Sequence, residues 1–321
     1  MAYALITCAA ALVLGGCGGP PYMPARPAPS LLQASDASEH TVGFFEGVGK
    51  TRLFEQHWRP KTSPRAVVVV VHGLKDHSSR YADLARRLVQ EGYAVHAFDL
   101  RGHAHSEGVR VGIDSFDDYL WDLDIFMPRV RTLDPGKPIF VLGHSMGGAI
   151  ATEYALTRKT PLRGLALSGA ALKIDVSGIK ILGTKMVAAL SPNAGVFNLD
   201  LDEFSRDPEV IRDGKSDAFV YQEGAPARTA RELIGAVNWV DDNMESLTTP
   251  VLIMHGAADK VTPPEGSQDL YKRAGSTDKT LKLYPGLYHD LLHEPEKAMV
   301  TGDIVSWLNA RAPESSPAGA R

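Results

Sequence analysis

The pattern of hydrophobic positions predicts buried strands that alternate with amphipathic helices. Residues 66–73 read AVVVVVHG, a continuous β-branched run typical of a strand buried on both faces of a parallel sheet. Residues 80–93 (RYADLARRLVQEGY) then place apolar side chains at helical spacing. The alternation continues with strand-like runs at 94–103, 139–145, 162–170, 250–259 and 281–289, and with an amphipathic helix at 116–133. This order predicts the α/β class with a mostly parallel, doubly wound sheet.

The alternation is interrupted at about residues 172–240, which read as helices and loops without a clear strand. A helical insertion between two strands of such a sheet lies over the strand ends, where ligands bind in these folds. We therefore expect this segment to form a cap over a binding site. Its apolar residues suit an acyl chain, and they equally suit packing of the cap onto the core.

The N-terminus begins with an uncharged apolar run of about fourteen residues that ends in Leu14-Gly15-Gly16-Cys17. The run is shorter than the roughly 20 residues that span a bilayer, and small residues before the cysteine suit a signal peptidase. The end of the run resembles the lipobox of bacterial lipoproteins, in which the cysteine carries lipid. No Lys or Arg precedes the run, so a plain secretory signal and a misassigned start are the alternatives.

The resulting organisation is a signal peptide at 1–17, a Pro/Gly-rich tether at 18–40, a folded domain at 41–310 and a disordered tail at 311–321. Lipid on Cys17 would hold the folded domain on a membrane of the bacterial envelope, outside the cytoplasm. The other cysteine, Cys8, lies within the signal, so we expect no disulfide in the mature domain.

Composition excludes several function classes. A net charge of -4 with 22% charged residues argues against binding to a nucleic-acid backbone. The eleven histidines are scattered, and the close pair His103 and His105 lacks the spacing of a metal motif. We therefore expect no metal, no cofactor and no obligate protein partner.

A serine stands between two glycines, each two positions away, where a strand-like run meets a helical one, in Gly143-His144-Ser145-Met146-Gly147. A sharp strand-to-helix turn needs small neighbours, and it exposes the residue at its tip beside a helix N-terminus, where developing negative charge is stabilised. The G-x-S-x-G pattern in this context predicts that Ser145 is a nucleophile.

Ser145 needs a general base and an orienting carboxylate, which follow in the order acid, then histidine, in this type of fold. Asp259 and His289 each follow a late strand, and they complete the predicted triad. A turn aspartate and a surface histidine are the alternatives, with His293 as the nearest competitor for the base.

An oxyanion hole requires two backbone N–H groups. We expect them from Met146, directly after the nucleophile, and from Leu74, in the loop after the strand at 66–73. His72, at the end of that strand, is interpreted as a buried residue that ties the loop down.

Six blocks together resemble the monoacylglycerol lipases and the wider group of serine hydrolases around them, which includes lysophospholipases and plant phenolic-ester esterases. The blocks are HGLKDHSSRY, FDLRGHAHSEG, GHSMGGAIA, SRDPEV, VLIMHGAADKVTPP and LYPGLYHDLLHE, within residues 43–310. The resemblance implies an α/β-hydrolase fold, the triad and oxyanion donors above, and a cap over an acyl tunnel. The chain departs from the usual RGHG at Ala104, where we expect a small change in the loop.

The predicted activity is hydrolysis of a monoacylglycerol-type lipid ester to fatty acid and glycerol through an acyl-enzyme. A lysophospholipase, a non-lipid esterase, a perhydrolase or an acyltransferase with the same triad remains an alternative, whereas epoxide and haloalkane hydrolases place Asp at the elbow. A catalytically silent envelope-associated binding protein is the alternative of a different class, and a fluorophosphonate probe separates it because only an active serine reacts. Acyl chain length, the leaving alcohol and the oligomeric state are not readable from the sequence.

Overall fold

The computed structural model describes residues 21–26, 38–158, 160–174 and 186–314. The predicted signal peptide, its Cys17 and most of the predicted tether lie outside these residues.

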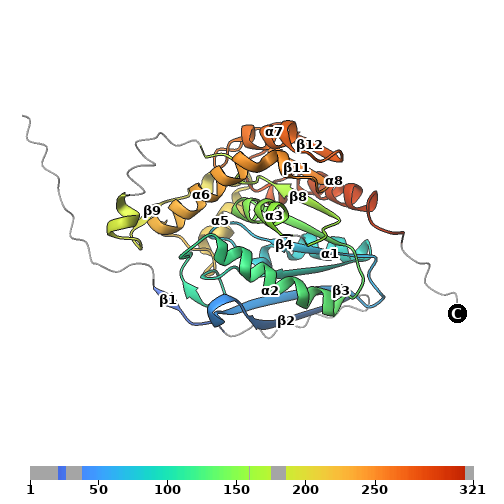
Figure 1. Ribbon diagram of the computed structural model, residues 1–321, viewed down its shortest axis with the longest axis horizontal. Helices are drawn as coiled ribbons and strands as arrows, with labels where there is room; N and C mark the ends of the chain where they lie inside the picture. Colours follow the sequence, from blue (N-terminus) through green and yellow to red (C-terminus); the bar gives the residue numbers. More distant parts are fainter. Residues whose placement is uncertain (1–20, 27–37, 159, 175–185, 315–321) are drawn as a thin grey trace, which may run out of the picture.

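One large sheet forms the centre of the molecule (Figure 1). Its eight strands run in the order β12-β11-β8-β7-β4-β5-β3-β2, and every neighbouring pair from β12 to β5 is parallel, whereas β3 and β2 are antiparallel additions. The strands are β2 (Ser38–Glu46), β3 (Arg52–Pro60), β4 (Ala66–Val71), β5 (Tyr93–Phe98), β7 (Ile139–His144), β8 (Gly164–Ser168), β11 (Val251–Gly256) and β12 (Lys279–Tyr284). The predicted mostly parallel sheet is confirmed, and its first strand begins at Ser38 rather than at residue 41.

Helices cover both faces of the sheet, which makes it doubly wound. Because side chains alternate along a strand, Val67 and Val69 of β4 join one core cluster and Val68 and Val70 join the other. The first cluster includes side chains of α2 (Asp117–Leu133), α3 (Met146–Thr157), α6 (Ala227–Asn243) and α7 (Pro264–Arg273). The second includes α1 (Ala82–Gln90) and α8 (Lys297–Asn309). The uniformly apolar run of β4 is therefore explained by burial on both faces.

A cap follows β8, and it is shorter than the sequence suggested. Its described elements are helical residues 186–190, β9 (Gly195–Phe197), the 3-10 turn η3 (Leu201–Glu203), α5 (Pro208–Ser216) and β10 (Ala225–Pro226), which pairs with β9. The next helix, α6, packs against α3 and contributes Leu233, Val237 and Val240 to the main core. The expected boundary at about residue 240 was thus too late, because an amphipathic pattern does not reveal which surface the helix covers.

Short elements complete the described chain. They are β1 (Tyr22–Met23), β6 (Gly108–Val109) and the 3-10 turns η1 (Val48–Lys50), η2 (Ser78–Tyr81), η4 (Met244–Ser246) and η5 (Leu291–His293). None of the helices within the described ranges is long and apolar enough to cross a membrane.

Both ends of the folded domain extend further than predicted. At the N-terminal end β1 pairs antiparallel with β6, and the N–H of Arg26 donates to the carbonyl of His105 at 3.0 Å, so residues 21–26 of the predicted tether lie on the domain. At the C-terminal end Arg311 forms an ion pair with Asp278, and Arg65 donates to the carbonyl of Pro313 at 2.8 Å. The predicted tail at 311–321 therefore begins too early. Composition could not reveal these contacts, because each depends on a distant partner.

Candidate active site

Ser145 occupies a strained turn between β7 and α3. Its backbone has φ 54° and ψ -122°, a conformation that costs on the order of 1–3 kcal/mol and persists only when the surroundings enforce it. The Ser145 N–H donates to the carbonyl of Ser168 at 3.0 Å, and its own carbonyl accepts from Ala171 at 3.0 Å. Gly147 lets the turn pack closely, because a Cβ there would lie 2.1 Å from the carbonyl oxygen of Val71. The nucleophile elbow read from the sequence thus has the expected geometry.

His289 and Asp259 form a buried hydrogen-bonded pair. The Nδ1 atom of His289 lies 2.8 Å from Oδ2 of Asp259, and both side chains are fully buried. The other oxygen, Oδ1, accepts from the backbone N–H groups of Val261 at 2.7 Å and Thr262 at 2.9 Å. The carboxylate is therefore fixed so that His289 donates from Nδ1, which leaves Nε2 as the free basic nitrogen.

The basic nitrogen is directed away from Asp259. Nε2 of His289 is buried and has no hydrogen-bond partner among the residues that the structure describes. The centroid of the imidazole lies 4.9 Å from that of His144, the residue before Ser145, and the ring of Phe204 from the cap lies nearly perpendicular to the imidazole with the centroids 5.2 Å apart. The three predicted triad residues are thus brought to the same end of the sheet, where β7, β11 and β12 end.

Burial and hydrogen bonding act in opposite directions on Asp259. Burial raises the pKa of this carboxyl, but the charge of His289 and hydrogen bonds from His255 and His289 outweigh burial and hold the pKa well below its ordinary range. Asp259 is therefore ionised throughout the neutral range. Burial lowers the pKa of His144 to about 4, so this neighbour of the triad is uncharged near neutral pH.

Leu74 and Met146, the predicted oxyanion donors, line one cavity together with Ser145. Met146 begins α3, so its N–H has no acceptor within the helix. The N–H of Leu74 likewise makes no hydrogen bond in the described part of the chain. His72 fixes the loop, since its Nδ1 lies 2.8 Å from the carbonyl of Gly73 and its Nε2 accepts from the N–H of Leu100 at 2.9 Å.

Ion pairs with two buried carboxylates hold the Leu74 loop against the loop that carries His289. Arg80, which is partly buried, contacts Asp76 at 3.2 Å and Asp290 at 2.8 Å. His293, the competing histidine, bonds Oδ1 of Asp290 through Nδ1 at 2.8 Å and the carbonyl of Arg80 through Nε2 at 3.0 Å. Both ring nitrogens of His293 are engaged, so it serves this network and not the serine.

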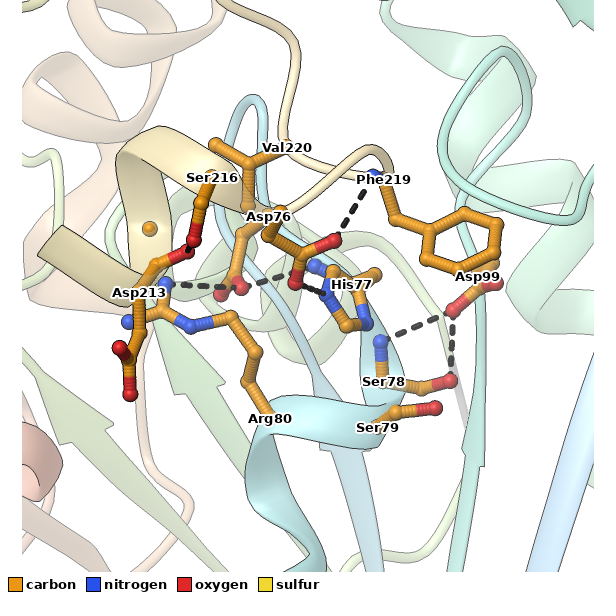
Figure 2. A network of polar contacts seen from close by, with 12 residues as sticks. Asp76, His77, Ser78, Ser79, Arg80, Asp99, Asp213, Ser216, Phe219 and Val220 are labelled. Carbon is orange, nitrogen blue, oxygen red and sulfur yellow. Dashed lines mark hydrogen bonds and ion pairs between the residues drawn. The ribbon is translucent and has the colours of Figure 1, made fainter. Parts of the chain in front are cut away.

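The cap is tied to the same loop from above (Figure 2). His77 contacts Asp217, just after α5, at 2.9 Å, and the N–H of Phe219 donates to the same carboxylate at 2.7 Å. Below His77, the backbone N–H and hydroxyl of Ser78 donate to Asp99 at 2.9 and 2.6 Å. The consecutive residues His77 and Ser78 thereby link the Leu74 loop to the cap and to Asp99, which directly follows β5.

The cavity at Ser145 has a volume of about 650 Å³, and most of its lining is apolar. Its charged lining residues are Lys173, Asp259, Lys260 and Glu265. Its apolar lining from the cap and α6 comprises Ile174, Val196, Leu199, Ala230, Leu233 and Ile234. Among the described residues no three His, Cys, Asp or Glu side chains gather as a metal site.

Two polar residues at the triad were missed in the sequence. His255, within the otherwise apolar β11, lies 3.0 Å from Oδ2 of Asp259, and the hydroxyl of Thr262 lies 3.0 Å from the same oxygen. A histidine in a strand buried on both faces was the available signal, because a buried polar side chain needs a partner.

Ala104, the departure from RGHG, retains a glycine-like backbone. Its φ is 39°, in the left-handed region, although the side chain is almost fully buried. The substitution therefore adds local strain outside the triad.

Known proteins share this architecture and much of this sequence. The chain is 39% identical over 279 residues to the monoacylglycerol lipase of Mycolicibacterium smegmatis, an alignment that covers 86% of this chain and 99% of the relative. The crystal structure of Paleococcus ferrophilus monoacylglycerol lipase is 30% identical, with a TM-score of 0.73 and coverage of 81% of this chain and 99% of that one. A soluble variant of the Saccharomyces cerevisiae monoglyceride lipase, at 24% identity, shares the fold with a TM-score of 0.78, covering 90% of this chain and 100% of that one.

The family assignment follows from a match that covers most of the folded domain. Residues 62–296 match the Hydrolase_4 model, which is described as serine aminopeptidase, S33. The predicted α/β-hydrolase fold is confirmed by these structural neighbours. The chain therefore belongs to the Hydrolase_4 family of α/β-hydrolases.

Proposed function

We propose that the protein is a serine carboxylester hydrolase that cleaves monoacylglycerols to fatty acid and glycerol through an acyl-enzyme on Ser145. The observation that carries the proposal is the buried 2.8 Å pair of His289 and Asp259, which leaves Nε2 of His289 without a partner among the described residues, at the end of the sheet where the strained Ser145 lies. The similarity to proteins named monoacylglycerol lipases supports the choice of substrate.

In the first step, Nε2 of His289 takes the proton of the Ser145 hydroxyl while Oγ attacks the ester carbonyl. Asp259 keeps the imidazole in the required tautomer and stabilises its protonated form. The N–H groups of Leu74 and Met146 donate to the oxyanion, a contribution of about 2.7–4 kcal/mol per donor in comparable sites. His289 then returns the proton to the leaving glycerol oxygen, which leaves the acyl group on Ser145.

In the second step, His289 takes a proton from water, and the resulting nucleophile attacks the acyl carbonyl. The same N–H groups stabilise the second oxyanion, and the fatty acid leaves as Ser145 recovers its proton. The strained backbone and the fixed carboxylate are present before substrate arrives, so they need not reorganise during the reaction.

The cavity supports an acyl substrate. Its apolar lining from the cap and α6 removes methylene groups from water, which contributes about 0.8 kcal/mol for each buried CH₂. We expect affinity to rise with chain length until the cavity is full. A panel of monoacylglycerols of graded length, run beside tributyrin and lysophosphatidylcholine, tests this. Preference for lysophosphatidylcholine would overturn the substrate and keep the mechanism.

The nucleophile is tested with Ser145→Ala and a short p-nitrophenyl ester. We expect turnover to be abolished while circular dichroism and thermal unfolding remain those of a folded protein. Ser276→Ala is the matched control, because Ser276 is also a buried serine but bonds the carbonyl of Asp278, outside the cavity. Unchanged turnover in Ser145→Ala would exclude Ser145 as the nucleophile.

We propose in addition that the protein is a lipoprotein of the bacterial envelope, anchored through lipid on Cys17. The apolar run that ends in Leu14-Gly15-Gly16-Cys17 supports this. Metabolic labelling with a fatty acid should mark the wild type and leave Cys17→Ser unmarked. Absence of label in the wild type would refute the anchor.

A further inference from the structure

Asp259 is shared by two buried imidazoles. Oδ2 lies 2.8 Å from Nδ1 of His289 and 3.0 Å from Nε2 of His255. His255 is fully buried on β11, and its other nitrogen, Nδ1, lies 2.7 Å from the hydroxyl oxygen of Ser267 on α7. Ser267 is also fully buried. A continuous chain of polar contacts therefore runs from Ser267 through His255 and Asp259 to His289.

The proton positions in this chain follow from its acceptors. Nε2 of His255 lies 3.1 Å from the backbone carbonyl oxygen of Thr262 as well as 3.0 Å from the Asp259 carboxylate. Both of these oxygens only accept, so Nε2 of His255 must carry a hydrogen. A hydroxyl can both donate and accept, so Ser267 satisfies the other ring nitrogen, Nδ1, at 2.7 Å. His255 is thus fixed as a donor to Asp259.

We propose that His255, oriented by Ser267, is a positioning residue for acyl transfer, because it donates a second imidazole N–H to Asp259 and so sets the proton affinity of His289. The inference rests on the proposed function. A carboxylate oxygen that serves two N–H donors offers less negative charge to each. His255 therefore keeps Asp259 ionised and aligned while it weakens the hold of Asp259 on the proton of His289.

The other groups around the imidazole of His289 leave this assignment intact. His144, from β7, is kept neutral by burial, which lowers its pKa to about 4. Asp290, the next residue, is paired with Arg80 and His293. Lys260, beside Asp259, lies over the ring of Tyr288 at 4.7 Å. Within the described part of the chain, His255 is accordingly the titratable side chain other than His289 that bonds the carboxylate.

The experiment compares pH profiles of kcat/KM for a p-nitrophenyl ester between pH 5 and 9. His255→Phe keeps a ring of similar size but removes the donor, whereas His255→Gln retains an N–H. Two or three hydrogen bonds lower the pKa of a carboxylate from about 3.9 to below 2, so each donor lowers the carboxylate pKa by somewhat less than one unit. We expect the acidic limb of the kcat/KM profile of His255→Phe to lie at higher pH than in the wild type, by about half a pH unit or more. We also expect a lower kcat and an unchanged KM. His255→Gln should lie near the wild type.

His96→Phe is the matched control. His96 is another fully buried strand histidine, and it bonds Asp134 at 2.8 Å; neither residue lines the cavity at Ser145. It should lose stability without moving the acid limb. If His255→Phe does not fold, Ser267→Ala should give a smaller shift in the same direction, because it leaves the Nε2–H in place.

Two results would overturn the role of His255. One is an acid limb that stays at the wild-type position in the folded variants. The other is an equal shift in His96→Phe. If Ser145→Ala retained the activity of the wild type, the proposed function would be overturned as well. If activity depends on Ser145 but the acidic limb of His255→Phe stays at the wild-type pH, only the inference about His255 is overturned.

Discussion

Replacing Asp259 with Asn should invert the tautomer of His289. The position of Oδ1 receives two backbone N–H groups, from Val261 at 2.7 Å and Thr262 at 2.9 Å. An asparagine must therefore place its carbonyl oxygen there, since its NH₂ group would meet two donors. The NH₂ group then takes the position of Oδ2 and donates to Nδ1 of His289. The proton of His289 moves to Nε2, where the base should be.

The magnitude follows from the loss of the base. A comparable exchange in a Ser-His-Asp triad lowers kcat about 10⁴-fold, which corresponds to roughly 5.5 kcal/mol. His255 adds to the defect, because its Nε2–H, 3.0 Å from Oδ2, would face an NH₂ group in place of an acceptor. We expect KM to change little, because the cavity lining keeps its shape.

The assay is initial-rate hydrolysis of a p-nitrophenyl ester, with rates of fluorophosphonate labelling as a second readout. Asp134→Asn is the matched control, because Asp134 is a buried carboxylate that accepts from His96 at 2.8 Å outside the site. It should lose stability and keep kcat. A folded Asp259→Asn whose kcat falls less than about tenfold would refute this reading of the site.

Three further changes have defined outcomes. Gly147→Ala should destabilise the fold by about 3 kcal/mol in urea unfolding, because the new Cβ would lie 2.1 Å from the Val71 carbonyl oxygen, and near-normal stability would contradict the packing described. Ala104→Gly should raise the free energy of unfolding by about 0.5–1 kcal/mol, since relief of the φ of 39° outweighs the added freedom of the unfolded chain, and a loss of stability would contradict the strain. Burial lowers the pKa of His103 to about 3 and that of His144 to about 4, from 6.5. Below about pH 6.5 the unfolded chain takes up protons that these folded residues do not, so the contribution of each histidine to stability is full above that pH and falls by about 1.4 kcal/mol per pH unit down to about pH 4. Urea titrations at pH 7, 6 and 5 measure this, and constant stability would contradict it.

The sheet and the strand-to-helix turn at Ser145 could be predicted because both depend on local sequence patterns. The run at 66–71 has no polar residue, and the structure buries it on both faces. Ser145 was identified because the turn needs Gly143 and Gly147 within a few residues, so sequence and geometry are closely linked there. The order of Asp259 and His289 after late strands was equally readable, because parallel strands end on one edge of the sheet.

Features that depend on distant partners could not be predicted in this way. The pairing of β1 with β6 joins Tyr22 to Val109, and nothing near Tyr22 indicates it. The contact of His255 with Ser267 requires α7 to pack on β11, and the hydrophobic pattern does not specify which polar atoms meet. The same limit applies to α6. Its apolar face packs on α3, but the sequence pattern is equally compatible with packing inside a cap.

Peptide mapping of a fluorophosphonate adduct tests the central claim most directly, namely that Ser145 is activated by His289 and Asp259. The account predicts one adduct, on Ser145, that forms rapidly in the wild type, slowly in His289→Gln and not at all in Ser145→Ala. An adduct on a different residue, or ester turnover without any adduct on Ser145, would contradict it.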